Sequence, residues 1–307
     1  ELDDLDLNPV LTRVDAGDAP KRSARKGRQA IAKTLDEEIL SDAAAVFERR
    51  EKMQMTYTVK NTDRSIGART SSAIVRRFGA DGLPDGHLTI RLAGSAGQSL
   101  GVFAAKGLRI ELDGDANDYV GKGLSGADII IRPFKDSDDP RLPRNAVIGN
   151  TCLFGATSGT LYAAGRAGGR FAVRNSGANA VVEGCAANGC EYMTGGVVVI
   201  LGRIGDNFAA GMTGGRAFVL DKDERFEKCV NLESVVWRRF SELDPSHEEQ
   251  CRQMIEAHAR ETRSSRGQEI LNDWARWRDY FYDVTPLETI KREQAAARAV
   301  DQHAPSA

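Results

Sequence analysis

The sequence predicts a mainly β fold: a single-stranded, right-handed parallel β-helix with coils of about 20 residues, flanked by α-helices. Two observations predict it. Short runs of β-branched and apolar residues recur without a helix-period segment between them, and a glycine opens each run. These glycines lie 19, 33, 18, 19 and 19 residues apart, in the order Gly107, Gly126, Gly159, Gly177, Gly196 and Gly215.

The period determines the kind of repeat. A unit of 19 residues is too short for helix-pair repeats, which need about 33 residues or more. Strands of successive coils would stack about 4.8 Å apart, and each coil must turn sharply several times. Because glycine adopts a positive φ without a Cβ clash, we expect the six glycines to occupy equivalent corners. Gly67 and Gly86 are weaker members of the set, and residues 135–145 read as a polar loop inserted into one repeat.

Alternate residues of each strand would line the interior of such a coil. The pattern leaves the register of the strands open. The candidates for the interior are Leu108, Ile110, Ile129, Ile131, Leu161, Val181, Val197, Val199, Phe218 and Leu220.

Before the repeats, residues 1–55 are predicted to form a linker arm and an N-terminal helix. The arm is acidic and then basic, with the run KRSARKGR over 21–28. That run lacks interleaved aromatic residues, so a solvated linker or docking arm is favoured over a nucleic-acid contact. The helix is expected over 34–53, with Thr34 and Glu37 as its capping box.

The repeats occupy residues 56–222, and residues 223–307 are predicted to be helical. One helix begins at a capping box of Ser246 and Glu249 and runs to about residue 260, and another covers 268–281 with an aromatic face. These helices either cap an open end of the coils or present that face to another domain. The tail from about residue 292 is expected to fray.

Composition excludes several classes of function. A net charge of −2 gives no general attraction to nucleic acid or anionic lipid, and no apolar run reaches the ~20 residues of a membrane span. No signal peptide opens the chain, and its first residue is Glu1, so we expect a cytoplasmic fragment or processed product. Cys185 and Cys190 are expected to be structural thiols, since the five cysteines lack iron–sulfur spacing.

Three motifs invite a catalytic or binding interpretation. Gly121–Gly126 reads GKGLSG, but a strand rather than a helix follows it, which disfavours a dinucleotide site. His247, Cys251 and His258 fall on one helix face, although a single helix closes a tetrahedral zinc site poorly.

The third motif is acidic: Asp113, Asp115 and Asp118 suit a coil corner, and together with Glu111 and Arg132 they do not repeat over successive coils as a glycan site would. We therefore predict no catalytic, cofactor-binding or metal-binding residue in this chain.

Several long sequence segments resemble those of one protein family. They are NTDRSIGARTSSAI, LAGSAGQSLGVFAAKGLRIELDGDANDYVGKG, YVGKGLSGADIIIRP, GCEYMTGGVVVILG and GRIGDNFAAGMTGGRAFVLD. Over residues 55–222 the chain resembles the C-terminal domain of the glutamate synthase large subunit, which is named for its repeated glycine motif. LDDLDLNPVL and EILNDW, outside that range, are also similar to the family.

The resemblance implies a right-handed β-helix without catalytic residues, which spaces and orients an amidotransferase domain and an FMN-binding synthase domain. The family makes two glutamates from glutamine, 2-oxoglutarate and reductant. It uses FMN and a 3Fe–4S cluster, passes ammonia through an internal tunnel, and often has a small FAD/iron–sulfur subunit. None of its catalytic residues maps onto this sequence, so the chain alone is expected to be inactive and to bind no cofactor.

Two alternatives remain at this point. One is a free-standing β-helix subunit of a synthase-like or formylmethanofuran-dehydrogenase-like complex. The other, from a different class of protein, is a self-contained carbohydrate-active β-helix.

Overall fold

The computed structural model describes residues 5–20, 22, 27, 33–134 and 145–292. The chain divides into two units, residues 1–33 and 34–307. In the first unit the described residues contain one short helix, α1 (Asn8–Leu11), and none of its residues is buried. The rest of this section concerns the second unit.

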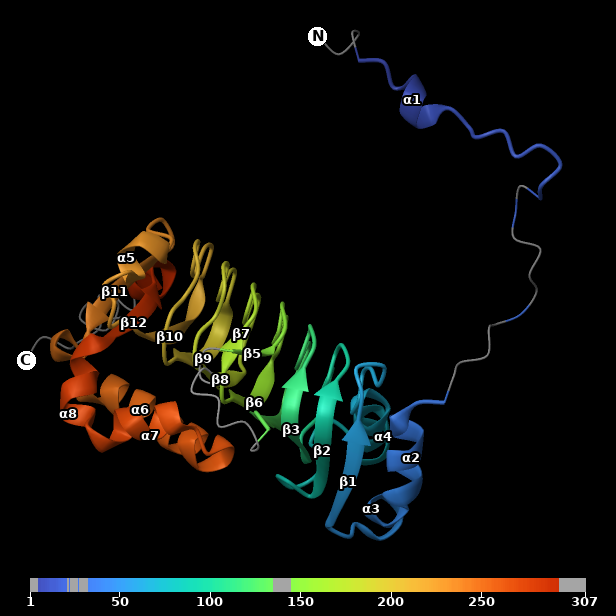
Figure 1. Cartoon of the computed structure of the whole chain (residues 1–307), viewed down its shortest axis with the longest axis horizontal. Coiled ribbons are helices and arrows are strands. Elements are labelled where there is room, and N and C mark those ends of the chain that lie inside the picture. Colours follow the sequence, from blue (N-terminus) through green and yellow to red (C-terminus); the bar gives the residue numbers. More distant parts are fainter. Residues whose placement is uncertain (1–4, 21, 23–26, 28–32, 135–144, 293–307) are drawn as a thin grey trace, which may run out of the picture. The chain divides into compact units, whose positions relative to one another are not determined.

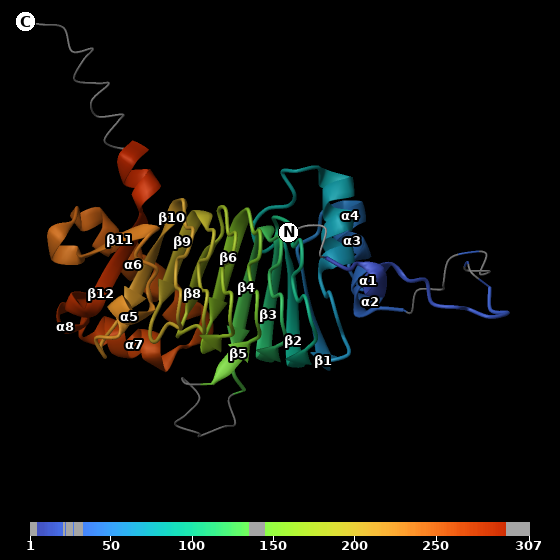
Figure 2. The ribbon, with the colours of Figure 1, turned by 90° about the horizontal axis from the view of Figure 1, so that it is seen from above.

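Ten strands of the second unit form a continuous path in one sheet, and eight of them follow chain order with parallel pairing. Figures 1 and 2 show these strands side by side from β1 to β10. The eight are β1 (Met53–Val59), β2 (Leu88–Ala96), β3 (Leu108–Ala116), β4 (Ser125–Arg132), β6 (Ser158–Ala163), β8 (Asn179–Val182), β9 (Thr194–Ile200) and β10 (Gly214–Leu220). The prediction of a mainly β fold with flanking helices is confirmed.

Short segments in the connections between these strands form a second set of parallel pairings. The short strand β5 (Ala146–Ile148) pairs with β3 and with β7 (Arg166–Ala167). An isolated parallel bridge continues this row from Ala167 to Cys185. Each repeat therefore contacts the next along more than one line of hydrogen bonds.

The connections between strands contain an unexpected conformation. In six successive connections, three residues spaced two apart have φ between 54° and 67°. We call residues 99–103, 119–123, 151–155, 170–174, 188–192 and 207–211 the left-handed bends. Most of the positive-φ positions are not glycine, although left-handed backbone costs an L-residue roughly 1–2 kcal/mol.

Hydrogen bonds between neighbouring bends offset that cost. In one bend, the Arg170 and Arg174 amides donate to Ala187 and Glu191 of the following repeat, whereas the Ala172 amide donates to Cys152 of the preceding one. The first, middle and last residues of the other bends follow the same pattern in most cases. Because this pairing depends on the neighbouring repeat, the local sequence does not reveal it.

The sheet has a core on each face. Leu108, Ile110, Ile129, Ile131 and Leu161 lie in the main core, as expected. The other five interior candidates belong to the opposite face, and their neighbours take the interior positions instead: Val182, Val198, Ile200, Ala217 and Val219. The opposite face holds Val181, Val197, Val199, Phe218 and Leu220.

The C-terminal helices cover that opposite face. They are α6 (Pro245–Thr262), α7 (Ser265–Asn272) and α8 (Trp274–Trp277), and α6 contacts β4, β6, β8 and β9. Figure 1 shows them alongside the β6–β10 part of the sheet. The sequence predicted that these helices either cap an open end of the coils or present an aromatic face to another domain. In the described residues they do neither, because they pack against the face of the sheet. A strand covered on both faces reads as a continuous apolar run, which is why its register was ambiguous.

The end of the sheet also differs from expectation. The segment after α5 (Phe226–Cys229) was expected to be helical, but it contributes β11 (Val235–Arg239). A short 3-10 helix, Phe240–Glu242, follows β11. Another, Arg278–Tyr280, comes directly before β12 (Phe281–Pro286). β12 lies antiparallel between β10 and β11. The helix expected over 268–281 is therefore shorter, and the sheet continues beyond the last glycine repeat.

At the other end, the helix expected over 34–53 is split into α2 (Leu35–Asp42) and α3 (Ala44–Arg49), which end before β1. A further helix, α4 (Ala68–Phe78), was not predicted. Both predicted capping boxes are wrong: Thr34 makes no capping bond, and Asp244, not Ser246, caps α6. Instead, the buried Asp36 accepts hydrogen bonds from the first amides of α4, at Gly67 and Arg69, both 2.7 Å.

Candidate functional site

The predicted corner glycines occupy the starts of the strands. Gly107, Gly126, Gly159, Gly196 and Gly215 all have φ between 76° and 122°. Gly177 departs from this set because it has no positive φ, and the backbone of Ala178 rather than that of Gly177 lies nearest to Gly196. A Cβ at Gly196 would overlap the carbonyl oxygen of Ala178, so this position requires glycine for both conformation and space.

The GKGLSG segment overlaps the left-handed bend 119–123, and its amides already donate hydrogen bonds. The Gly121 amide donates to Leu100 at 2.9 Å, the Gly123 amide to Phe154 at 2.8 Å, and the Ser125 amide to Ala104 at 2.9 Å. A phosphate-binding loop needs amides free to face the ligand. The backbone of this segment is therefore committed to the neighbouring repeats.

His247, Cys251 and His258 do not converge. His247 Nδ1 lies 2.6 Å from Asp283 Oδ2, whereas Cys251 is buried in the apolar core beneath α6. Among the described residues, no three histidine, cysteine or acidic side chains come together as ligands for a metal ion. An iron–sulfur cluster would therefore find no set of ligands in this part of the chain, and the expected absence of metal stays a prediction.

The cysteines have the environment of structural thiols. Burial raises the pKa of Cys152 and of Cys185 to about 12, and raises the pKa of Cys190 and Cys251 well above the ordinary value. Because the thiolate is the reactive form, these four thiols have little nucleophilic character near neutral pH.

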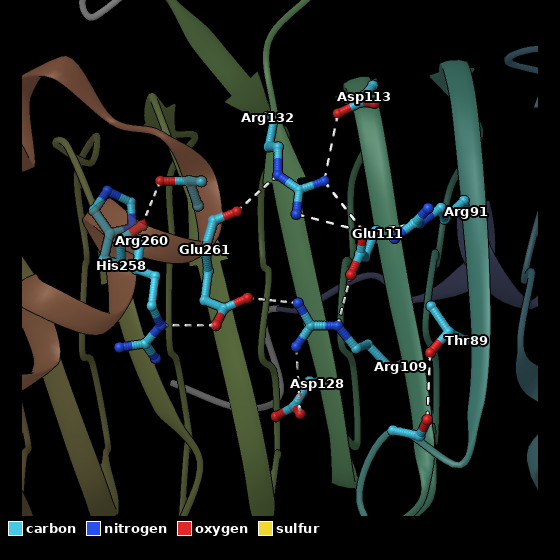
Figure 3. A network of polar contacts seen from close by, with 12 residues as sticks. Thr89, Arg91, Arg109, Glu111, Asp113, Asp128, Arg132, His258, Arg260 and Glu261 are labelled. Atoms are coloured by element: carbon cyan, nitrogen blue, oxygen red, sulfur yellow. Dashed lines mark hydrogen bonds and ion pairs between the residues drawn. The ribbon is translucent and has the colours of Figure 1, made fainter. Parts of the chain in front are cut away.

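A network of polar side chains lies on the outer face of β2, β3 and β4, where α6 ends (Figure 3). Its centre is Glu111, which is 8% exposed. Glu111 pairs with Arg109 at 2.7 Å, Arg132 at 3.3 Å and Arg91 at 3.4 Å. These residues project from neighbouring strands because β2, β3 and β4 run in register.

Two of these arginines also bind the last turn of α6. Arg109 Nη2 donates to Glu261 Oε2 at 2.5 Å, and Arg132 Nε donates to the Glu261 carbonyl oxygen at 2.7 Å. Asp113 contacts Arg132 at 3.5 Å, so one of the predicted corner carboxylates joins this cluster. The arrangement ties a helix to three strands through paired charges, and it leaves Glu111 without the free position that a general base needs.

The pKa shifts agree with such a structural role. Burial opposes ionisation of Glu111, but hydrogen bonds and charge from Arg109 and Arg132 outweigh it and hold the pKa of Glu111 below its ordinary value. The pKa of Glu261 is lowered in the same way, by Arg109 and Arg260 against the effect of burial. A catalytic acid at neutral pH would need the opposite shift.

We expect Glu111→Gln to destabilise the folded chain by about 2 kcal/mol at pH 7, because it leaves partly buried arginines without their carboxylate. Since the folded pKa of Glu111 is lowered, this contribution is present above its ordinary pKa and is lost as pH falls through the folded value. Urea unfolding at several pH values checks this. Glu256→Gln, which removes an exposed partner of Arg252 on α6, is the control and should change little.

A second polar cluster contains serine, histidine and glutamate, but not in a catalytic order. Ser264 Oγ donates to Glu183 Oε1 at 2.5 Å and accepts a bond from the Gly267 amide, which caps α7. The fully buried His258 approaches Glu183 only to 3.6 Å. In a catalytic triad the serine bonds to the histidine. Here its proton is held by the carboxylate, so the cluster positions α7.

A pocket of 540 Å³ lies between the ends of β9 and β10 and the start of α7. Its charged groups largely neutralise one another: Arg203 pairs with Asp223 at 2.7 Å and Arg266 with Glu269 at 2.9 Å. This balance gives the pocket no clear preference for an anion or a cation.

Several predicted features lie outside the described residues, wholly or in part: the basic run 21–28, the inserted loop 135–145 and the tail after residue 292. The described helices include none long and apolar enough to cross a bilayer. Asp115 is exposed, and Asp118 accepts the Asn150 amide at 2.7 Å, which places it in a turn rather than in a glycan-binding row.

Comparison with known proteins identifies the family. The family model described as the GXGXG motif matches residues 36–287. The chain belongs to this family. It is 53% identical over 292 residues to the glutamate synthase [NADPH] large chain of Azospirillum brasilense, covering 95% of this chain and 19% of that protein.

Other relatives carry the same kind of name. A ferredoxin-dependent glutamate synthase of Arabidopsis thaliana is 40% identical, over 96% of this chain and 18% of its own length. The glutamate synthase [NADPH] large chain of Bacillus subtilis is 44% identical, over 84% of this chain and 17% of its own. The resemblance found in the residues is confirmed, and the chain spans less than a fifth of the length of these relatives.

Proposed function

We propose that this chain is a non-catalytic structural part of a glutamate synthase large chain. The observation that carries the proposal is the 53% identity to such a large chain over 95% of the present sequence. The parent enzyme would be an oxidoreductase of glutamate biosynthesis and ammonia assimilation, acting in the cytoplasm. It would convert glutamine, 2-oxoglutarate and reductant into two glutamates.

We infer that the second unit is wound as a right-handed parallel β-helix over about residues 56–222, between an N-terminal arm with a helix (1–55) and a C-terminal segment (223–307). The support is the parallel pairing in chain order, the second row of bridges and the stacked left-handed bends. The right hand follows from the general preference of parallel crossover connections.

The structural role would be to hold an amidotransferase domain and an FMN-binding domain of the same chain at a fixed separation and orientation. Reacting groups tolerate errors of only about 1 Å before large losses of rate. Continuous ladders and a sheet packed on both faces resist deformation. A stiff element suits a reaction in which ammonia made at one site must reach another through an internal tunnel.

The cofactors of the parent enzyme, FMN and a 3Fe–4S cluster, are proposed to lie outside these 307 residues, as are any contacts with a small FAD/iron–sulfur subunit. The charged groups of the two polar clusters pair with one another. The first cluster also lines a pocket of about 260 Å³, but its carboxylates there are already paired with arginines. The relatives favour this proposal over a free-standing complex subunit and over a carbohydrate-active protein.

The test compares the longer protein that contains this sequence with residues 1–307 alone. The longer protein should make glutamate from glutamine and 2-oxoglutarate with a reductant, and should carry flavin and iron. Residues 1–307 alone should show no glutaminase or synthase activity and no flavin absorbance after gel filtration. Activity or stoichiometric flavin in the short chain would contradict the structural role, and a longer protein without glutamate formation would contradict the family's activity here.

A further inference from the structure

Bulky side chains occupy strained backbone positions on the surface of the left-handed bends. Phe103, Tyr119 and Tyr192 have φ of 56°, 65° and 54°. They are also 58%, 37% and 52% exposed. A positive φ is unfavourable for a bulky residue, and an exposed ring recovers little of that cost by burial. Strain of this kind tends to occur where a contact or function maintains it.

Several equivalent positions in other bends carry residues that fit the conformation better, although Thr151, Arg170 and Arg174 also adopt it. The backbone ladder aligns Phe103 and Tyr192 with Gly123, Gly155 and Gly211. Likewise, it aligns Tyr119 with Asn188 and Asn207. Glycine and asparagine are the residues that favour this backbone. The fold itself therefore does not require an aromatic residue at these three positions.

Two of the three rings pack against the next repeat. A Cβ at Gly123 would meet the ring of Phe103, and a Cβ at Gly211 would meet the ring of Tyr192, so each ring lies over the glycine of the next repeat. Rigid aromatic rings bind a partner at low cost in conformational entropy. The same surface thus offers apolar contact area that is already in place.

Cationic side chains lie between the rings. Lys122 Nζ is 5.6 Å from the centre of the Tyr119 ring. Arg170 has a side chain that is 62% exposed and lies 3.6 Å from Glu191, and Arg174 is exposed. We call Phe103, Tyr119, Lys122, Arg170, Arg174 and Tyr192 the bend strip.

We propose that the bend strip is a docking surface for another domain of the same longer polypeptide, one that presents carboxylates and apolar side chains. This rests on the proposed function, in which other domains of the large chain surround this one. The chain covers only 19% of its Azospirillum relative, so most of such a polypeptide lies beyond the part described here.

The size and composition of the strip favour this partner over a second copy. Phe103 and Tyr192 lie four repeats apart in the stack of bends. At about 4.8 Å per repeat, this separation is roughly 20 Å. A strip of six residues is smaller than the roughly 20–30 residues, or about 800 Å², that each partner contributes to a stable interface between separate proteins. A domain in the same chain needs less area, because tethering supplies a high effective concentration. Interdomain surfaces are also more polar than obligate dimer interfaces.

The experiment places the photo-crosslinking residue benzoylphenylalanine at position 192 of the full-length protein. Position 75 serves as the exposed control on α4, since Val75 is 45% exposed in regular helix. Irradiation at 192 should yield peptides joined to residues outside 1–307, at several times the yield from position 75. The variant Arg174→Glu, which reverses an exposed charge of the strip, should lower that yield severalfold with an unchanged melting temperature.

Three results would overturn the proposal: crosslinks only within residues 1–307, crosslinks between tagged and untagged copies, or a yield no higher than at position 75. Glutamate formation by the unmodified full-length protein is measured in parallel. Crosslinks without glutamate formation would refute the enzyme's proposed activity and keep the docking surface. Glutamate formation without crosslinks would refute the docking surface alone.

Discussion

Gly196→Val is expected to unfold the chain or to lower its free energy of unfolding by at least ~3 kcal/mol. Gly196 has φ of 83°, which a β-branched residue adopts only with strain. Its missing Cβ also leaves the space taken by the Ala178 carbonyl and the Asn175 amide group. Because that carbonyl belongs to the adjacent repeat, relief of the clash would require the two repeats to separate. Urea unfolding followed by circular dichroism measures the loss.

Gly169→Ala is the matched control. Gly169 has no positive φ, and an added Cβ would meet nothing nearer than 3.5 Å. It should remain within about 0.5 kcal/mol of wild type, and Gly196→Ala should fall between the two. Equal stability of the Gly196 and Gly169 variants would show that the strand-start position does not require glycine.

In the full-length protein, the same Gly196→Val change should uncouple glutamine hydrolysis from glutamate formation or unfold the large chain. No residue proposed to do chemistry is altered. The ratio of the two rates, measured at a temperature where the variant remains folded, distinguishes these outcomes. A wild-type ratio together with wild-type stability would contradict the role of this position in the scaffold.

Asp283→Ala should destabilise the C-terminal part of the fold by about 3 kcal/mol. Asp283 is 1% exposed on β12. It hydrogen-bonds to His247 Nδ1 at 2.6 Å and Thr285 Oγ1 at 3.0 Å, and forms an ion pair with Arg216 Nε at 3.4 Å. It thereby joins β12 to β10 and to the start of α6. Removing the carboxylate leaves Arg216 partly buried without its countercharge, which costs more than the pair itself contributes.

Tryptophan fluorescence suits this test, since all three tryptophans, at positions 237, 274 and 277, lie in the C-terminal part. Asp279→Ala removes the same charge from an exposed position nearby and should leave the unfolding midpoint nearly unchanged. If both variants unfold at the same urea concentration, Asp283 is not the link between the sheet and α6.

Much of the sheet followed from the repeat alone. The start of each strand could be placed near its glycine because the same local requirements recur in every repeat: a sharp turn, then slim apolar residues. Gly107, Gly126 and Gly196 show the expected positive φ. Gly177 does not: the register shifts by one residue between the pairs Ser176–Gly195 and Ala180–Val198, and the backbone of Ala178 lies nearest to Gly196.

The candidate site was recognised only in part. Glu111, Asp113 and Arg132 were weighed as a possible site and set aside because they do not recur over successive coils. The cluster also includes Arg109, whose partner Glu261 lies far along the chain at the end of α6. A spacing rule cannot find an ion pair between residues about 150 positions apart, since nothing in the local pattern marks it.

By itself, the sequence determined the β-rich repeat, the chain order of its parallel strands, the presence of flanking helices and the family. These properties follow from local chemistry repeated about every 19 residues. Only the tertiary structure decided which face of β8, β9 and β10 lies inside, that β12 extends the sheet, and that ordinary residues adopt left-handed bends. Each depends on a partner distant in sequence: a covering helix, an adjacent strand or the hydrogen bonds of the next repeat.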